Sequence, residues 1–226
     1  PRDVVRRDLP PRDLDAIVAL AEPDLLRSRD ARFLVPGATG FIGYWLPRSL
    51  VEANHQLGLG LHIVALARRP ELGVIDANCV TPIAADVRDL DAGSIASVGH
   101  VDAVIHLACS SSAPAGGADR DARRLSSTII DGTRAVLRLA AASGCLRTLV
   151  ASSGAVHGRG SERPRRVTED CPSAALPGEP GAAYGLAKRL MDGEAGADTD
   201  AGEVDVTVAR MLAFGGPLLH LDIHNA

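Results

Sequence analysis

A tyrosine and a lysine stand four residues apart in the stretch Ala-Tyr-Gly-Leu-Ala-Lys over 183–188. If this stretch begins a helix, Tyr184 and Lys188 lie on one face of it and can act together. A lysine ammonium beside a phenol favours the phenolate, so we expect Lys188 to lower the pKa of Tyr184. A tyrosine tuned in this way could exchange protons with a substrate hydroxyl near neutral pH. Taken alone, such a pair is more often an ordinary surface contact.

Two serines follow an apolar run over 146–151 that predicts a buried strand. Ligands of parallel α/β sheets bind beyond the carboxyl ends of the strands. We therefore expect Ser152 and Ser153 to face a cofactor at that edge, where a serine hydroxyl can orient the same substrate oxygen as Tyr184. A serine at a strand end, together with the tyrosine and the lysine, favours a catalytic site.

Three glycines follow the first apolar run, over 33–35, and precede an apolar pattern with helical spacing that extends to about His55. Strand, glycine loop and helix in this order are typical of the start of a dinucleotide-binding βαβ unit. Gly37 permits the tight turn, Gly40 lets the backbone approach a pyrophosphate, and Gly43 lets the helix pack closely against the strand. The helix N-terminus adds a partial positive charge that favours phosphate.

The end of the second predicted strand, over 61–66, indicates which nicotinamide cofactor to expect. An acidic residue normally stands there in NAD-binding proteins, because it bonds the ribose 2′-hydroxyl and repels a 2′-phosphate. Here Arg68 and Arg69 follow the strand, and no acid does. Arginine favours a 2′-phosphate, so the sequence predicts NADP, with NAD as the alternative. The two arginines could also be solvated loop charges.

Further apolar runs predict strands over 80–85, 101–107 and 206–210, and a helix over 121–143. Strands alternate with helical stretches, and the strands are apolar almost throughout. The predicted fold class is therefore α/β: a Rossmann-like, doubly wound parallel sheet with helices on both faces.

The sequence divides into three predicted parts. Residues 1–31 contain an amphipathic pattern from Asp13 and should form an N-terminal helical extension. Residues 32–217 should form the NAD(P)-binding Rossmann domain. Residues 218–226 should begin a C-terminal substrate-binding region that is largely absent.

Composition limits the classes of partner. A net charge of −4 and 3% aromatic residues argue against nucleic acid and anionic membranes, and no apolar run approaches the ~20 residues of a membrane span. The four cysteines show no C-x-x-C spacing, which predicts reduced thiols in a cytoplasmic protein. Among them, Cys109 is expected to be small apolar packing. No metal site is predicted, because His220, Asp222 and His224 have no further ligand cluster.

Taken together, these residues resemble the extended short-chain dehydrogenase/reductases, in particular the NAD(P)-dependent sugar-nucleotide epimerase/dehydratase family. The resemblance covers about residues 32–217 and rests on Gly37-Ala-Thr-Gly-Phe-Ile-Gly43, Asp86-Val87, His106-Leu-Ala-Cys109, Gly132-Thr133, Ser152 to Gly158, Tyr184-x-x-x-Lys188 and Arg210 to Pro217. It implies that Ser153 is the catalytic serine, Tyr184 the proton-transfer residue and Lys188 its electrostatic partner. The cofactor-binding residues that it implies are Gly37, Thr39, Gly40, Phe41, Ile42, Gly43, Arg68, Asp86, Val87, Leu107, Ala108, Tyr184 and Lys188. It also implies a nucleotide-sugar substrate and a homodimer.

The chain departs from the family's pattern at informative positions. Pro36 stands where threonine is usual and removes one backbone N–H. Members that eliminate water carry Asp-Glu after the catalytic hydroxyl residue, whereas this chain has Gly154 and Ala155, which cannot transfer protons. We therefore expect an NAD(P)-dependent sugar-nucleotide epimerase or 4-ketoreductase that acts by hydride transfer, with Tyr184 as acid/base. The alternative is a non-catalytic NAD(P)-binding regulatory protein on the same scaffold.

Overall fold

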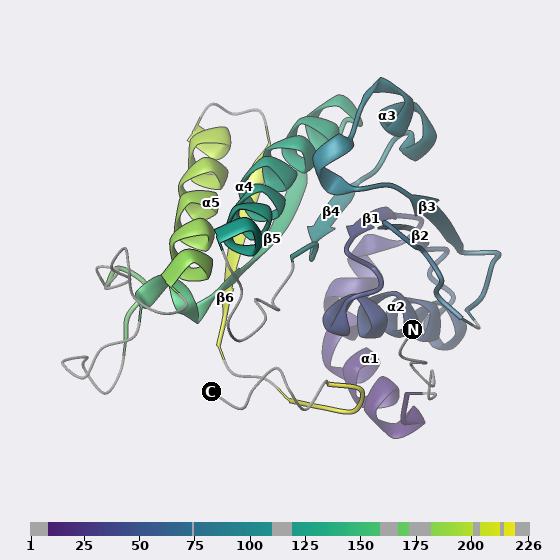
Figure 1. The fold of residues 1–226 in the computed structure, drawn as a ribbon. Helices are drawn as coiled ribbons and strands as arrows, with labels where there is room; N and C mark the ends of the chain where they lie inside the picture. The colour runs from purple at the N-terminus through teal and green to yellow at the C-terminus, as the bar shows by residue number, and fades with distance from the viewer. Residues whose placement is uncertain are drawn as a thin grey trace.

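The computed structural model describes residues 9–73, 75–109, 119–158, 167–171, 182–200, 204–212 and 215–219. In these ranges, six parallel strands form one sheet in the order β3-β2-β1-β4-β5-β6 (Figure 1). The strands are β1 (Arg32–Pro36), β2 (His62–Ala67), β3 (Val80–Ala84), β4 (Ala103–His106), β5 (Arg147–Ser153) and β6 (Asp205–Met211). This is the strand order of a doubly wound dinucleotide-binding sheet, which confirms the predicted fold class.

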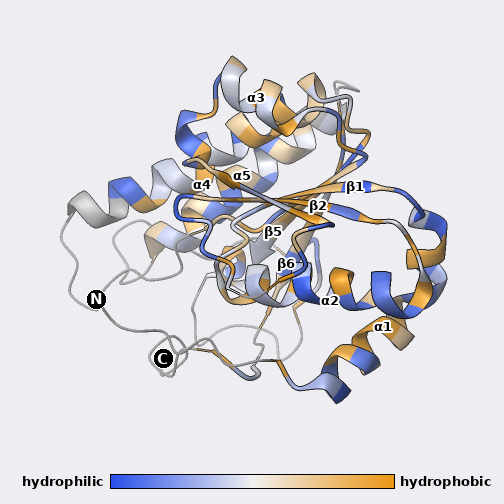
Figure 2. Cartoon of the chain, turned by 90° about the vertical axis from the view of Figure 1, so that its right-hand side faces the viewer, coloured by the Kyte–Doolittle hydropathy of each residue, from blue (hydrophilic) through white to orange (hydrophobic). Residues whose placement is uncertain are grey.

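Helices cover both faces of the sheet, as predicted (Figure 2). They are α1 (Pro11–Leu25), α2 (Phe41–Leu57), α3 (Ala92–Val98), α4 (Asp119–Ala142) and α5 (Ala182–Asp200). Successive residues of β1 point to opposite faces: Leu34 packs in the cluster that contains Val136 of α4, whereas Val35 packs with Leu50 of α2. Within the described residues, no helix is both long enough and apolar enough to span a membrane.

The first helix packs on the outside of α2. Val18 of α1 is buried in the same apolar cluster as Leu50 and Ala53 of α2, and the side chain of Gln56 donates a hydrogen bond of 2.7 Å to Asp15. The helical pattern before β1 therefore adds a second layer to the α2 face of the sheet.

Two local features differ from the sequence-based expectation. The short helix α3 was not predicted, although Asp91 and Ser94 cap it reciprocally and the Asp91 carboxylate accepts the Ser94 N–H at 2.8 Å. Strand β5 also includes Ser152 and Ser153, which were expected to follow it. The two serines are therefore held in register with β6, opposite Arg210 and Met211.

Candidate active site

The glycine loop leaves β1 in close contact with the end of β4. Gly37 has a φ of 91°, in the region that favours glycine. A Cβ on Gly37 would lie 2.5 Å from the backbone nitrogen of Ala108, and the Leu107 N–H donates to the Pro36 carbonyl at 2.8 Å. The structure thus brings together three predicted cofactor-binding residues, Gly37, Leu107 and Ala108. Pro36 is tolerated because its carbonyl, which proline retains, makes the bond to the β4 segment.

The loop then leads directly into α2. Thr39 and Gly40 are exposed at its tip, and Gly40 is the N-cap, with no side chain capping the first turn. A Cβ on Gly43 would overlap the carbonyl oxygen of Gly37, so the close approach is to the loop rather than to the strand. An exposed glycine at a helix N-terminus provides N–H groups and a partial positive charge, which fit a pyrophosphate. The first turn contains the predicted residues Phe41, Ile42 and Gly43.

The segments that follow β2 and β3 bring Arg68 near Asp86. Arg88 forms a two-nitrogen contact with the Asp86 carboxylate, at 3.0 Å and 2.7 Å. Hydrogen bonds from Arg88 lower the pKa of Asp86 to about 2, and the charge of the exposed Arg68 contributes to the same effect. Val87 is buried beside Gly132 of α4, where a Cβ would lie only 2.8 Å from the Val87 side chain. The predicted cofactor-binding residues Arg68, Asp86 and Val87 therefore lie near one another, with Arg88 bonded to Asp86.

Tyr184 lies partly buried in the first turn of α5, in contact with Ser153 at the end of β5. Burial raises the pKa of Tyr184 to about 12, and Cys109 adds to this rise, whereas the hydrogen bond with Ser153 opposes it. The predicted lowering of this pKa by Lys188 is therefore wrong, because burial dominates and the ammonium is bound elsewhere. Tyr184 is a neutral phenol at neutral pH.

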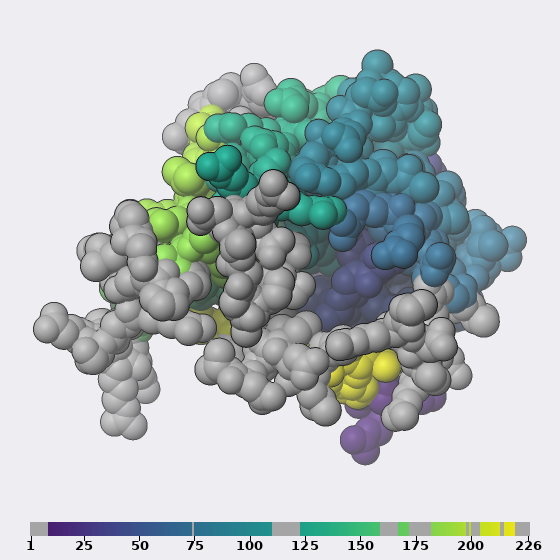
Figure 3. All heavy atoms as spheres, viewed as in Figure 1, coloured from purple at the N-terminus to yellow at the C-terminus, as the bar shows by residue number. Residues whose placement is uncertain are grey.

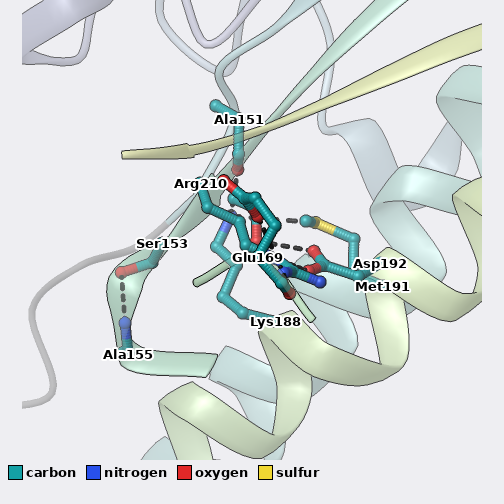
Figure 4. A network of polar contacts seen from close by, with 9 residues as sticks. Ala151, Ser153, Ala155, Glu169, Lys188, Met191, Asp192 and Arg210 are labelled. Carbon is teal, nitrogen blue, oxygen red and sulfur yellow. Dashed lines mark hydrogen bonds and ion pairs between the residues drawn. The ribbon is translucent and has the colours of Figure 1, made fainter. Parts of the chain in front are cut away.

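Lys188, one turn after Tyr184, is buried, with only 3% of its surface exposed. Its ammonium donates to the carbonyl oxygen of Ala151 in β5 at 2.5 Å and lies 3.7 Å from the sulfur of Met191 (Figure 4). Burial lowers the pKa of Lys188, whereas Cys109 and Asp192 oppose that effect. Lys188 is also the only lysine in the chain, since every other one of the 24 basic Lys and Arg residues is arginine. Composition alone thus singles out this position.

Cys109, just past β4, packs against an apolar cluster that contains Ala187 and Met191 of α5, as expected, and it also belongs to this group of polar side chains. Its thiol makes side-chain contacts with Tyr184 and Lys188; burial raises the pKa of this thiol, and both partners lower it. His106, at the end of β4, is buried, with Nε2 3.0 Å from the Thr133 hydroxyl. Burial, and then the charge of Lys188, lower the pKa of His106 to about 3, so this ring is neutral beside the ammonium.

Ser152 does not face the cofactor edge, contrary to the prediction. It is buried, and its hydroxyl donates to the Asp192 carboxylate at 2.5 Å. Asp192 was not predicted to take part in the site. The signal was present, since Tyr184, Lys188 and Asp192 are spaced by four residues and so share one face of α5.

Some predictions concern residues outside the described ranges. These are the ligand-type residues His220, Asp222 and His224. Among the residues that are described, no cluster of three potential metal ligands occurs. The described C-terminal residues 215–219, yellow in Figure 3, lie against α2, where the Trp45 indole donates to the Pro217 carbonyl at 3.3 Å.

Solved structures with this fold are numerous. A dTDP-glucose 4,6-dehydratase from Streptomyces venezuelae is 28% identical, with a TM-score of 0.69 over 84% of this chain and 58% of its own. A short-chain dehydrogenase/reductase superfamily protein from Agrobacterium tumefaciens is 26% identical, with a TM-score of 0.60 over 79% and 48%. A UDP-N-acetylglucosamine 4-epimerase from Methanobrevibacter ruminantium, at 20% identity and a TM-score of 0.65 over 80% and 55%, shows the fold alone. No curated protein matches the chain.

The parallel sheet, the glycine loop after β1 and the tyrosine–lysine pair on α5 define the class of extended short-chain dehydrogenase/reductases. A family model described as the NAD dependent epimerase/dehydratase family matches residues 33–224, and the chain belongs to that family. The chain spans about half the length of the solved structures that it resembles.

Proposed function

We propose that this chain forms the cofactor-binding and catalytic part of an NAD(P)-dependent sugar-nucleotide epimerase or 4-ketoreductase. The observation that carries the proposal is the convergence of Ser153, Tyr184 and Lys188 at the carboxyl end of β5. The glycine loop follows β1 at the same edge of the sheet, because all the strands are parallel. Similar structures include a UDP-glucuronic acid 4-epimerase from Bacillus cereus with NAD and a Bordetella bronchiseptica enzyme with NAD and UDP.

The proton-transfer role falls to Tyr184. When bound, a nicotinamide supplies or accepts a hydride. A pKa of about 12 keeps the Tyr184 hydroxyl protonated, so it can donate to a ketone oxygen that Ser153 orients, a step common to both reactions. An epimerase must also remove a proton through Tyr184, which requires this pKa to fall when ligands bind.

Dehydration is not proposed, despite the likeness to a 4,6-dehydratase. Gly154 and Ala155, the two residues that follow Ser153, carry no group that can transfer a proton. An added Cβ at position 154 would meet the tip of the exposed Leu212 side chain, which would have to turn aside. We therefore propose that the chain shares the fold of the dehydratase but does not eliminate water from its substrate.

The turnover experiment uses purified protein with UDP-glucose, UDP-N-acetylglucosamine, UDP-glucuronate, dTDP-glucose and the 4-keto form of dTDP-glucose. NMR reports epimers, and absorbance reports oxidation of NADPH. We expect turnover of at least one substrate, with a loss of about 10²- to 10⁴-fold in Tyr184→Phe. Cofactor binding without turnover of any of these sugars would instead support the regulatory alternative. A rate that Tyr184→Phe leaves unchanged would refute the assigned role of Tyr184.

NADP is the proposed cofactor, because Arg68 follows β2 where an acid would disfavour the 2′-phosphate. Binding can be measured by fluorescence, because Trp45 of α2, the only tryptophan, can transfer excitation energy to a bound reduced cofactor. We expect NADPH to bind about tenfold more tightly than NADH, the equivalent of one charge-assisted hydrogen bond. Arg68→Ser should abolish this preference. Arg69→Ser is the matched control, since both arginines are exposed but only Arg68 acts on Asp86.

A further inference from the structure

Two side chains of α5 hold neighbouring residues at the end of β5. Lys188 donates to the Ala151 carbonyl at 2.5 Å (Figure 4). Asp192 accepts from the Ser152 hydroxyl, also at 2.5 Å. The next residue along β5 is Ser153, the proposed catalytic serine. Helix α5 therefore holds the two residues of β5 that directly precede Ser153, whose position matters for proton transfer.

The Asp192 carboxylate also connects β5 to β6. Its second oxygen accepts from Nε of Arg210 at 2.9 Å, and Arg210 stands opposite Ser152 in the strand register. The Asp192 side chain is only 9% exposed, so its charge is desolvated and needs these partners. Arg210 in turn donates to the carboxylate of Glu169 at 2.9 Å, and that outer carboxylate is 85% exposed.

The charge of Asp192 also acts on Lys188, one helical turn away. It raises the pKa of Lys188 against the lowering effect of burial. The other titratable groups that interact with this ammonium are Cys109 and His106 at the end of β4, and Tyr184 of α5 contacts Cys109 in turn. Asp192 is thus the carboxylate, among the described residues, that acts on the ammonium directly.

We propose that Asp192 is a positioning residue of this active site: through Ser152 and Arg210 it fixes the end of β5, and with it the placement of Ser153 and Lys188 relative to Tyr184. The proposal rests on the proposed function, in which these three residues carry the chemistry. Asp192 acts through them, since its carboxylate oxygens are bonded to Ser152 and Arg210.

The same helix provides a matched control. Glu194, two residues after Asp192, pairs with Arg134 of α4, whose Nε lies 2.9 Å from the carboxylate. This ion pair has the same chemistry and joins two helices without touching β5. Glu194→Gln therefore removes a comparable contact of α5 with no expected effect on the site.

The first measurement does not depend on turnover. Because Lys188 is the only lysine, ¹³C-labelled lysine gives one resonance from this chain, assigned by its loss in Lys188→Arg. The pKa of Lys188 should be lower in Asp192→Asn than in the wild type, unchanged in Glu194→Gln, and closer to wild type in Asp192→Glu. A titration of Asp192→Asn that matches the wild type would overturn the proposal.

The second measurement uses the sugar nucleotide and cofactor that the protein turns over. In Asp192→Asn, kcat should fall by about ten- to a hundredfold, with KM within about twofold, because misplaced catalytic groups mainly slow the chemical step. Ser152→Ala keeps the charge and removes only the bond to β5; it should lower kcat while leaving the Lys188 resonance nearly unchanged. If Asp192→Asn fails to fold, Ser152→Ala still tests whether the bond between α5 and β5 affects kcat.

The two measurements separate the possible failures. If the wild type turns over no sugar nucleotide, the proposed function fails, and the lysine titration still tests the link between Asp192 and Lys188. If the wild type is active but both Asp192→Asn and Ser152→Ala keep its kcat, the positioning role fails and the proposed function stands. A loss of melting temperature alone, with normal kcat, would mean that Asp192 has a structural role only.

Discussion

Replacing Gly37 with alanine tests the glycine loop at its tightest point, and two costs add there. A Cβ at a φ of 91° costs about 1–2 kcal/mol, because left-handed backbone crowds it against the carbonyl oxygen. The same Cβ would lie 2.5 Å from the nitrogen of Ala108 and 2.6 Å from the carbonyl carbon of Leu107, backbone atoms that cannot rotate away. Overpacking of this kind costs about 1–3 kcal/mol. We expect Gly37→Ala to lower the free energy of unfolding by about 2–5 kcal/mol.

Gly58 provides the control for the backbone part of this cost. It ends α2 with a φ of 58°, but an added Cβ would meet no other atom within 4 Å. Gly58→Ala should therefore cost only about 1–2 kcal/mol. Urea denaturation of both variants, compared at equal m values, gives the steric contribution as a difference of about 1–3 kcal/mol.

Cofactor titration completes the experiment. Gly37→Ala should weaken NADPH binding, because the loop must move away from Ala108 to relieve the overlap, whereas Gly58→Ala should bind it as the wild type does. If Gly37→Ala costs no more stability than Gly58→Ala and binds NADPH normally, the contact between the glycine loop and the end of β4 is not tight. The reasoning that places the cofactor against this loop would then fail.

Two further predictions follow from single contacts. Lys188→Arg keeps the positive charge but should reduce turnover by at least about a hundredfold, because the larger planar guanidinium does not fit where the lysine side chain is only 3% exposed. Measurements of kcat and of the melting temperature test this prediction. A near-normal kcat would contradict it. The pKa of Asp86 lies at about 2, below its ordinary value of 3.8, so its carboxylate stabilises the fold above pH 3.8, and this stabilisation disappears as the pH falls through 2. Urea denaturation at about pH 5 and about pH 2.5 should show the wild type losing about 1 kcal/mol more than Asp86→Asn, after allowance for solvent screening; equal losses would argue against the Arg88 contact.

The fold was predictable because its signals are local. Each strand of a sheet covered on both faces is a short apolar run, and the glycines after the first run identify the turn into a helix. Helix α3 escaped prediction because its seven residues contain no strong apolar pattern. The capping pair Asp91 and Ser94 is the sequence signal for this helix, and it is weak without knowledge of the neighbouring strands.

The sequence places Tyr184 and Lys188 on one helix and Ser153 at the end of a strand, as the structure has them, but it does not predict their electrostatics. The spacing of Tyr184 and Lys188 places them on one helical face, but the pKa of Tyr184 depends on burial by segments far apart in the sequence. The orientation of Ser152 likewise depends on where α5 presents Asp192. Both are properties of tertiary packing, so a rule based on two residues in one helix gave the wrong sign for the pKa and the wrong direction for the serine.

The single lysine connects composition to chemistry. Arg88 and Arg134 make paired contacts with carboxylates, each through two nitrogens, which is the geometry that a planar guanidinium suits. At position 188 the cation instead meets a backbone carbonyl and a methionine sulfur in a buried space. A compact ammonium fits these partners, and its pKa, unlike that of arginine, can be adjusted by burial. A chain that otherwise uses only arginine therefore carries its one lysine in a buried space that suits a compact cation.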